Sequence, residues 1–177
     1  MIHIALGSNL ASPAGPPRQT LDAALTHLEG CGIRVMACSP FYESAALGTP
    51  DPQPPYVNAV AAVSLRGATP ETLLSTLLAV ERAFGRRREG FRAARTLDLD
   101  LLDWHGEVLP DPESWRAAAD GEAVPGPLFL PHPRLHRRRF VLAPLADLAP
   151  CWRHPVLGTG ITALLAATAE QELRRLD

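Results

Sequence analysis

The sequence predicts an α+β fold in which helices pack on one face of a sheet. Apolar residues alternate along several short stretches, two longer stretches have the spacing of amphipathic helices, and Pro- and Gly-rich segments separate them. Over residues 1 to about 104 the resulting order is βαββαβ, which is the ferredoxin-like arrangement. We expect a C-terminal extension after it.

The first strand is the apolar run "IHIAL", which ends at "GSN" (residues 7–9). After a Pro- and Gly-rich stretch, "RQTLDAALTHLEG" carries its leucines on one helical face. Ile33, Val35 and Ala37 then fall on one face of a half-buried strand. Prolines between residues 50 and 55 mark a loop, and the alternating "YVNAVAAVSLR" that follows should pair with the preceding strand.

The second helix is predicted to start at Thr69, a good N-cap residue followed by Pro70 at the first helical position, and to end near Gly85. The strand "TLDLDLLDW" closes the βαββαβ pattern. Residues 110–130 have the composition of a loop, and a small amphipathic helix is expected around residues 161–168.

The charge composition excludes several classes of function. A net charge of −2 gives no overall basic field for nucleic acid or an anionic membrane. All 17 basic residues are arginines, so neither a phosphate-loop lysine nor a Schiff-base lysine is available. A genome rich in GC codons would produce the same composition.

Neither a membrane span nor a disulfide framework is predicted. No apolar run approaches the roughly 18 residues that cross a bilayer, and the N-terminus lacks a signal-peptide pattern, so we expect a cytoplasmic protein. The odd number of cysteines, Cys31, Cys38 and Cys151, without any C-x-x-C pair, favours reduced thiols in the core over disulfides or a zinc site.

Two carboxylates stand out in the stretch "RTLDLDLLDW". Side chains alternate along a strand, so Asp98 and Asp100 should share the face opposite the leucines, with Cα atoms roughly 6.6 Å apart. Ionised carboxylates at this spacing repel one another, and two Mg²⁺ ions about 4 Å apart would remove the repulsion. The alternative interpretation is the solvated outer face of an edge strand.

Clusters of arginine lie on both sides of this pair in the sequence. Five precede the strand within ten residues, and Arg137, Arg138 and Arg139 form a second group. Because guanidinium groups bind phosphate oxygens bidentately, arginines beside acidic metal ligands indicate a magnesium-bound polyphosphate. A run of charge can also be an ordinary solvated surface, which explains two such runs and a D-x-D motif less well.

Other candidate residues have two interpretations from the sequence alone. The "GSN" turn could be a phosphate-binding nest or a simple tight turn. His132 could bind phosphate or be structural, Tyr56 and Phe140 could belong to the core, and Glu81 would by default be a surface carboxylate.

A set of motifs resembles a known family. "ALGSNL", "FYES", "YVNAV", "VERAFGRRR", "RTLDLDLL" and "PHPRLHRRRFVLAPLADLAP" occur in the order and approximate spacing of the 6-hydroxymethyl-7,8-dihydropterin pyrophosphokinases of folate biosynthesis. The resemblance covers residues 1 to about 150. It implies a ferredoxin-like monomer that transfers pyrophosphate from ATP to the hydroxymethyl group of the pterin and releases AMP.

The resemblance also implies the domain organisation and the partners. Residues 1–177 would form a single pyrophosphokinase domain with an insertion at 111–127, to which no role is assigned. Its ligands would be ATP and 6-hydroxymethyl-7,8-dihydropterin, with two Mg²⁺ ions and neither nucleic acid nor membrane. The chain departs from the usual pattern at Arg92, Ala93 and Ala94, where the family often has an aromatic residue and Gly-Pro.

Residue roles follow by matching these motifs. Asp98 and Asp100 would hold the metal ions, and Tyr56 and Phe140 would stack on the pterin while Asn58 reads its hydrogen-bonding edge. Ser44 and Leu47 would complete the pterin site. The residues that fall where the family contacts ATP are Glu81, Arg88, Arg95, Leu101, His132 and Arg138. The catalytic set would be Arg88, Arg95, Asp98 and Asp100.

Two other functions compete with this interpretation. A ferredoxin-like RNA-binding module would use the arginines, but it needs exposed aromatic residues on its central strands, and "YVNAVAAV" offers only Tyr56. A two-metal nuclease would use the D-x-D pair and would cleave nucleic acid with magnesium and without ATP.

Overall fold

The structure is a computed structural model of the chain, and it describes residues 1–46, 52–86, 93–121 and 128–176. Within this part, six strands form one sheet in the order β5-β1-β4-β3-β6, and β2 pairs with β4 beside β3. Every pair is antiparallel. The strands are β1 (Ile2–Ser8), β2 (Arg34–Cys38), β3 (Tyr42–Ser44), β4 (Tyr56–Ser64), β5 (Asp98–Trp104) and β6 (Arg174–Arg175).

The helices fall between the strands as the sequence predicts for residues 1–104. Thr69 caps the second helix, because its hydroxyl accepts a hydrogen bond from the Thr72 backbone N–H at 3.3 Å. The βαββαβ order is therefore confirmed, with the second strand split into β2 and β3. The helices are α1 (Pro17–Gly30), α2 (Pro70–Ala83), α3 (Pro112–Asp120), the 3₁₀ turn η1 (Leu135–Arg137), α4 (Arg139–Leu148) and α5 (Ile161–Ala166).

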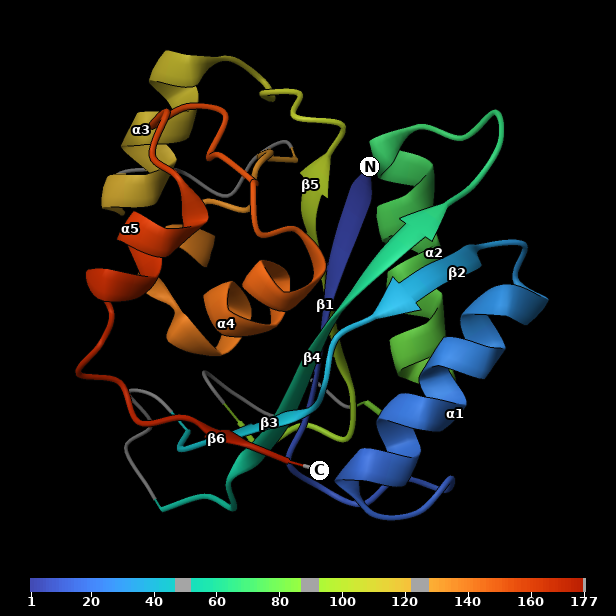
Figure 1. Cartoon of the computed structure of the whole chain (residues 1–177). Coiled ribbons are helices and arrows are strands. Elements are labelled where there is room, and N and C mark those ends of the chain that lie inside the picture. Colours follow the sequence, from blue (N-terminus) through green and yellow to red (C-terminus); the bar gives the residue numbers. More distant parts are fainter. Residues whose placement is uncertain (47–51, 87–92, 122–127, 177) are drawn as a thin grey trace.

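The two helices of the βαββαβ unit, α1 and α2, pack on one face of the sheet as predicted, and helices of the C-terminal extension cover the other face (Figure 1). The first core lies under α1 and α2, where Ile4 of β1 packs with Leu21 and Leu77. The second core lies under α4 and α5, where Val60 and Leu102 face Leu142. The reason is that β4 is apolar at successive positions, so both of its faces must be buried.

The segment expected to be a loop contains α3. Asp111 is its N-cap and accepts hydrogen bonds from the Glu113 and Ser114 backbone N–H groups, both at 2.9 Å. Pro112 occupies the first turn, and Gly121 ends the helix with a left-handed φ of 89°. These start and stop signals were present in the sequence but were outweighed by its loop-like composition.

The structure also tests what the sequence predicted for the cysteines and for membrane spans. Cys31, Cys38 and Cys151 are free thiols, but Cys31 and Cys151 are exposed, so the expectation of core thiols was wrong. In the described ranges, each helix is too short or too polar to cross a membrane.

His154 is buried in a cluster of aromatic rings with Trp115 of α3 and His136 of η1. Its ring centroid lies 4.8 Å from that of Trp115 and 5.7 Å from that of His136. Burial and the neighbouring His136 lower the pKa of His154 from 6.5 to about 4, although the Asp103 carboxylate acts in the opposite direction. The ring is therefore neutral in the folded chain.

This burial makes folding stability depend on pH. The unfolded chain binds a proton at His154 below about pH 6.5, whereas the folded chain does so only near pH 4. We predict that the neutral His154 ring contributes up to about 3 kcal/mol to the free energy of unfolding. This contribution is present above pH 6.5 and is lost as the pH falls towards 4. Denaturant titrations at several pH values should show a shallower pH slope for His154→Gln. The exposed control His27→Gln should keep the original slope, and identical slopes for all three proteins would contradict the assignment.

Candidate active site

A cavity of about 610 Å³ opens on the face of the sheet that α4 covers. Its floor includes β1 and β5, and its walls come from the end of β3, the start of β4, α4 and the C-terminal end of α3. Among its lining residues are Gly7, Ser44, Tyr56, Asn58, Arg95, Asp98, Asp100, Asp120, His132, Arg134, Arg137, Arg138 and Phe140. Most of the residues proposed from the sequence therefore lie around one space.

Asp98 and Asp100 both line this cavity, while Leu99 and Leu101 between and beside them are buried in the first core. The two carboxylates keep partial access to solvent, with side chains 22% and 36% exposed. Opposite Asp98 on β1 is Gly7, and a Cβ there would lie 3.8 Å from Asp98 and 3.6 Å from Asn58. A larger residue at this position would fill the floor of the cavity.

Two arginines neutralise Asp98. Arg95 Nη1 donates to Asp98 Oδ2 at 2.6 Å, and Arg86 Nη1 lies 2.8 Å from Asp98 Oδ1. Burial raises the pKa of Asp98, Asp100 adds to the rise, and the two arginines oppose it. Arg86 is a residue that the matching of motifs missed, although it belongs to the arginine cluster before the strand.

Glu81 is buried rather than on the surface, so its default interpretation was wrong. Its side chain is 3% exposed, and its Oε1 accepts a hydrogen bond from the Leu99 backbone N–H at 2.7 Å. The same carboxylate forms an ion pair with Arg86. Glu81 thus joins the end of α2 to β5 and holds Arg86 next to Asp98, outside the residues that line the cavity.

Asp100 faces a second pair of basic groups. His132 Nε2 and Arg138 Nη1 each lie 3.8 Å from Asp100 Oδ2. The Arg134 backbone N–H donates to His132 Nδ1 at 3.1 Å, so we assign the ring proton to Nε2, which faces the carboxylate. Because burial lowers the pKa of His132, this neutral tautomer is a hydrogen-bond donor aimed at the cavity.

An amide and two aromatic rings line the cavity beside the acidic pair. Asn58 is buried, and its Nδ2 donates to Ser44 Oγ at 3.0 Å, which orients the amide. Tyr56 and Phe140 are both partly exposed to the cavity, and the Arg138 guanidinium lies 5.7 Å from the centre of the Phe140 ring. These groups offer flat apolar surfaces next to a polar edge.

Asn9, in the "GSN" turn, clamps the backbone before β5. Its Oδ1 accepts from the Arg95 N–H at 2.7 Å, and its own N–H donates to the Arg95 carbonyl at 3.0 Å. Its Nδ2 donates to Gln53 Oε1 and to the Pro54 carbonyl. The turn therefore positions Arg95 and the segment before β4, a role that the short motif did not reveal.

Two of the matched residues that the structure describes, Glu81 and Leu101, do not line the cavity. Leu101 lies in the first core, on the face of β5 opposite the aspartates. Leu47 and Arg88 fall outside the described residues. In the ranges that are described, no group of three or more His, Cys, Asp or Glu side chains could hold a metal ion. An ion at Asp98 and Asp100 would need further oxygen ligands from a bound phosphate or from water.

The sequence matches a family model described as 7,8-dihydro-6-hydroxymethylpterin-pyrophosphokinase (HPPK) over residues 3–150. The chain belongs to this family. A Pseudomonas aeruginosa 2-amino-4-hydroxy-6-hydroxymethyldihydropteridine pyrophosphokinase is 40% identical over 176 residues, which cover 99% of this chain and 96% of the relative. The Synechocystis protein of the same name is 37% identical over 163 residues, or 92% and 73% of the two chains.

Solved structures share the HPPK fold. The wild-type HPPK-DHPS of Plasmodium falciparum matches with a TM-score of 0.67 at 14% identity, over 94% of this chain and 40% of that one. An HPPK-DHPS solved with its substrates matches with the same TM-score at 11% identity, over 96% and 45%. At such low identity these structures support the fold alone, and they agree with the ferredoxin-like assignment.

The buried position of Glu81 yields a stability prediction. Glu81→Ala should lower the free energy of unfolding by about 3 kcal/mol, because it leaves the buried Leu99 N–H without a partner and removes one of the two carboxylates that pair with Arg86. Glu71→Ala, at the exposed start of the same helix, should have a much smaller effect. Urea denaturation measures both variants, and equal losses would contradict the structural tie.

Proposed function

We propose that this chain transfers the pyrophosphoryl group of ATP to the hydroxymethyl oxygen of 6-hydroxymethyl-7,8-dihydropterin and releases AMP, a step of folate biosynthesis. The observation that carries the proposal is that an acidic pair, basic side chains and an aromatic–amide set line a single cavity in a chain of the HPPK family. We also propose that the chain is one pyrophosphokinase domain over residues 1–177, acting in the cytoplasm as a monomer.

The geometry argues against the two competing functions. An RNA-binding sheet needs its central strands exposed, but here β1 and β4 are covered by α1 and α2 on one face and, at Val60, by α4 on the other. A nuclease would need room for a nucleic-acid backbone, whereas the amide and rings at Asn58, Tyr56 and Phe140 suit a flat, small heterocycle.

The ATP half of the site would be built around Asp98 and Asp100. These carboxylates fit two Mg²⁺ ions, which would neutralise the polyphosphate and the departing AMP. Arg86 and Arg95 now pair with Asp98, and both would turn to phosphate oxygens when other positive charge reaches that carboxylate. His132 and Arg138 would bind phosphate from the Asp100 side, and Arg88 completes the proposed set.

The pterin half would use groups that the fold already orients. Tyr56 and Phe140 offer faces for stacking, and Asn58 presents an amide whose orientation Ser44 fixes. Leu47 is the remaining proposed contact. The hydroxymethyl oxygen would form a bond to the β-phosphorus while the bond from that phosphorus to the α–β bridging oxygen breaks. The hydroxyl proton is released to solvent, and catalysis rests on positioning and charge neutralisation.

The nucleotide product tests the reaction. With ATP, Mg²⁺ and 6-hydroxymethyl-7,8-dihydropterin, the protein should form AMP in equal amount to pyrophosphorylated pterin, because attack falls on the β-phosphorus. Chromatography of nucleotides and pterins together gives both quantities. Pterin-dependent ADP, or no turnover by well-folded protein, would overturn the proposal.

The acidic pair can be tested by single substitutions. Asp98→Asn and Asp100→Asn should each lower the transfer rate by at least ~10³, since each removes a metal ligand and several kcal/mol of charge stabilisation. Asp103→Asn is the matched control, because Asp103 lies on the same strand but bonds to His3 and does not line the cavity. The control should retain most of the activity, and unchanged turnover in either test variant would end the metal assignment.

A further inference from the structure

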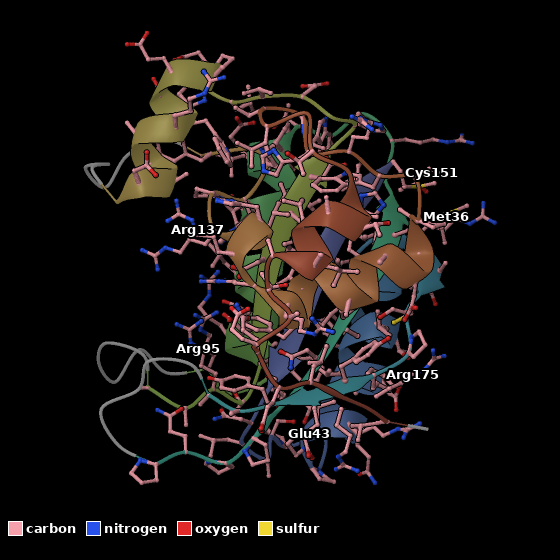
Figure 2. The ribbon with its side chains drawn as sticks, turned by 60° about the vertical axis from the view of Figure 1, so that its left-hand side comes forward. Met36, Glu43, Arg95, Arg137, Cys151 and Arg175 are labelled. Atoms are coloured by element: carbon pink, nitrogen blue, oxygen red, sulfur yellow. The ribbon has the colours of Figure 1, made fainter. Side chains whose placement is uncertain are left out.

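The helix α3 forms part of the cavity, although the sequence assigned no role to residues 111–127. Its C-terminal residues Ala119 and Asp120, with Gly121 after it, line the same space as His132 and Asp100. In Figure 2 the labelled Arg95 and Arg137 lie on the same side of the molecule, with α3 above Arg137. The helix therefore borders the basic side of the cavity.

A buried tryptophan anchors α3 to the segment that carries His132. The Trp115 side chain is almost fully buried, and its indole N–H donates to the Pro131 carbonyl at 2.5 Å. The next residue, His132, donates its backbone N–H to the Leu102 carbonyl of β5 at 2.8 Å. The segment is thus held from two sides, by α3 and by the sheet. These two bonds fix the position of the His132 backbone, from which the imidazole ring extends.

The end of α3 also carries a carboxylate at the rim of the cavity. Asp120 Oδ1 lies 3.0 Å from Arg137 Nη2, and both side chains are more than half exposed, at 65% and 58%. An ion pair this exposed adds little to stability. Its effect on a ligand is larger, because Asp120 holds Arg137 and adds a negative charge where an anionic ligand would lie.

We propose that α3 is a wall of the nucleotide half of the site, in which Trp115 is a positioning residue for ATP binding through Pro131 and His132, and Asp120 weakens ATP binding by retaining Arg137. This inference rests on the proposed function. The described groups proposed for the pterin, Ser44, Tyr56, Asn58 and Phe140, lie on β3, β4 and α4, and none of them bonds to Trp115 or Asp120.

Substitutions at the two residues should change the affinity for nucleotide in opposite directions. Trp115→Phe keeps an aromatic ring but leaves the Pro131 carbonyl without its donor, so nucleotide binding should weaken about tenfold. Asp120→Asn removes the charge that repels phosphate and competes for Arg137, so nucleotide binding should tighten about threefold. Pterin affinity should stay within about twofold in both variants.

Calorimetry with the Mg²⁺ complex of α,β-methylene-ATP, and separately with 6-hydroxymethylpterin, measures these affinities. The matched control is Trp152→Phe, since Trp152 packs against the same His154 but has no bond to Pro131, and it should leave both affinities unchanged. A nucleotide affinity within twofold of the original in folded Trp115→Phe, or equal losses for both ligands, would overturn the proposal.

The second variant decides the matter if Trp115→Phe does not fold. Asp120 is exposed, so Asp120→Asn should fold normally, and an unchanged or weakened nucleotide affinity would overturn the placement of α3 at the nucleotide. Failure of the unaltered protein to bind any nucleotide would instead contradict the proposed function itself.

Discussion

The alternation of side chains along β5 is the constraint on which the site depends. Leu99 and Leu101 are buried beneath α1 and α2, and this burial forces Asp98 and Asp100 to the opposite face of the sheet. A shift of one residue in register would bury both carboxylates in the first core and expose the leucines. Each apolar contact under the helices therefore also helps to hold the acidic pair in the cavity.

Placing carboxylates in this position is costly, and the surrounding basic groups offset the cost. Burial is the larger cause of the raised pKa values of Glu81 and Asp98, but Asp98 and Asp100 both help to raise the pKa of Glu81, and Asp100 also helps to raise that of Asp98. Arg86 lies between Glu81 and Asp98 and pairs with both. Arg86 and Arg95 oppose the rise in the pKa of Asp98, so the groups that favour its ionised form are guanidinium groups, which are themselves suited to phosphate.

The sequence predicted the parts of the fold whose signals are local. The Thr69–Pro70 cap, the alternation of "TLDLDLLDW" and the βαββαβ order depend on neighbours in the chain. Glu81 was misplaced because its partner, the Leu99 N–H, lies on another element. The sequence did not reveal that the C-terminal extension covers the second face, because a strand buried on both sides looks from its periodicity much like one buried on a single side.

Some contacts in the site could not be predicted because they join residues that are far apart in the sequence. Asn9 bonds to Arg95 across 86 residues, and no spacing rule connects the two. The family resemblance supplied Asn58 and Phe140 by matching, whereas the structure shows what orients the amide: the hydroxyl of Ser44. The helix α3 carried readable caps, but a loop-like composition and the absence of a family counterpart concealed its place beside the cavity.

The covering of the sheet by α4 and α5 has a consequence for the order in which the molecule can assemble. The strands β1, β4 and β5 can pair as soon as Trp104 has left the ribosome, but Val60 and Leu102 then face solvent until the residues of α4 emerge. Arg138 and Phe140 arrive with that same helix. The helix α4 therefore both covers Val60 and Leu102 and supplies the last side chains of the cavity, so a chain that still exposes this apolar face also lacks Arg138 and Phe140 at its site.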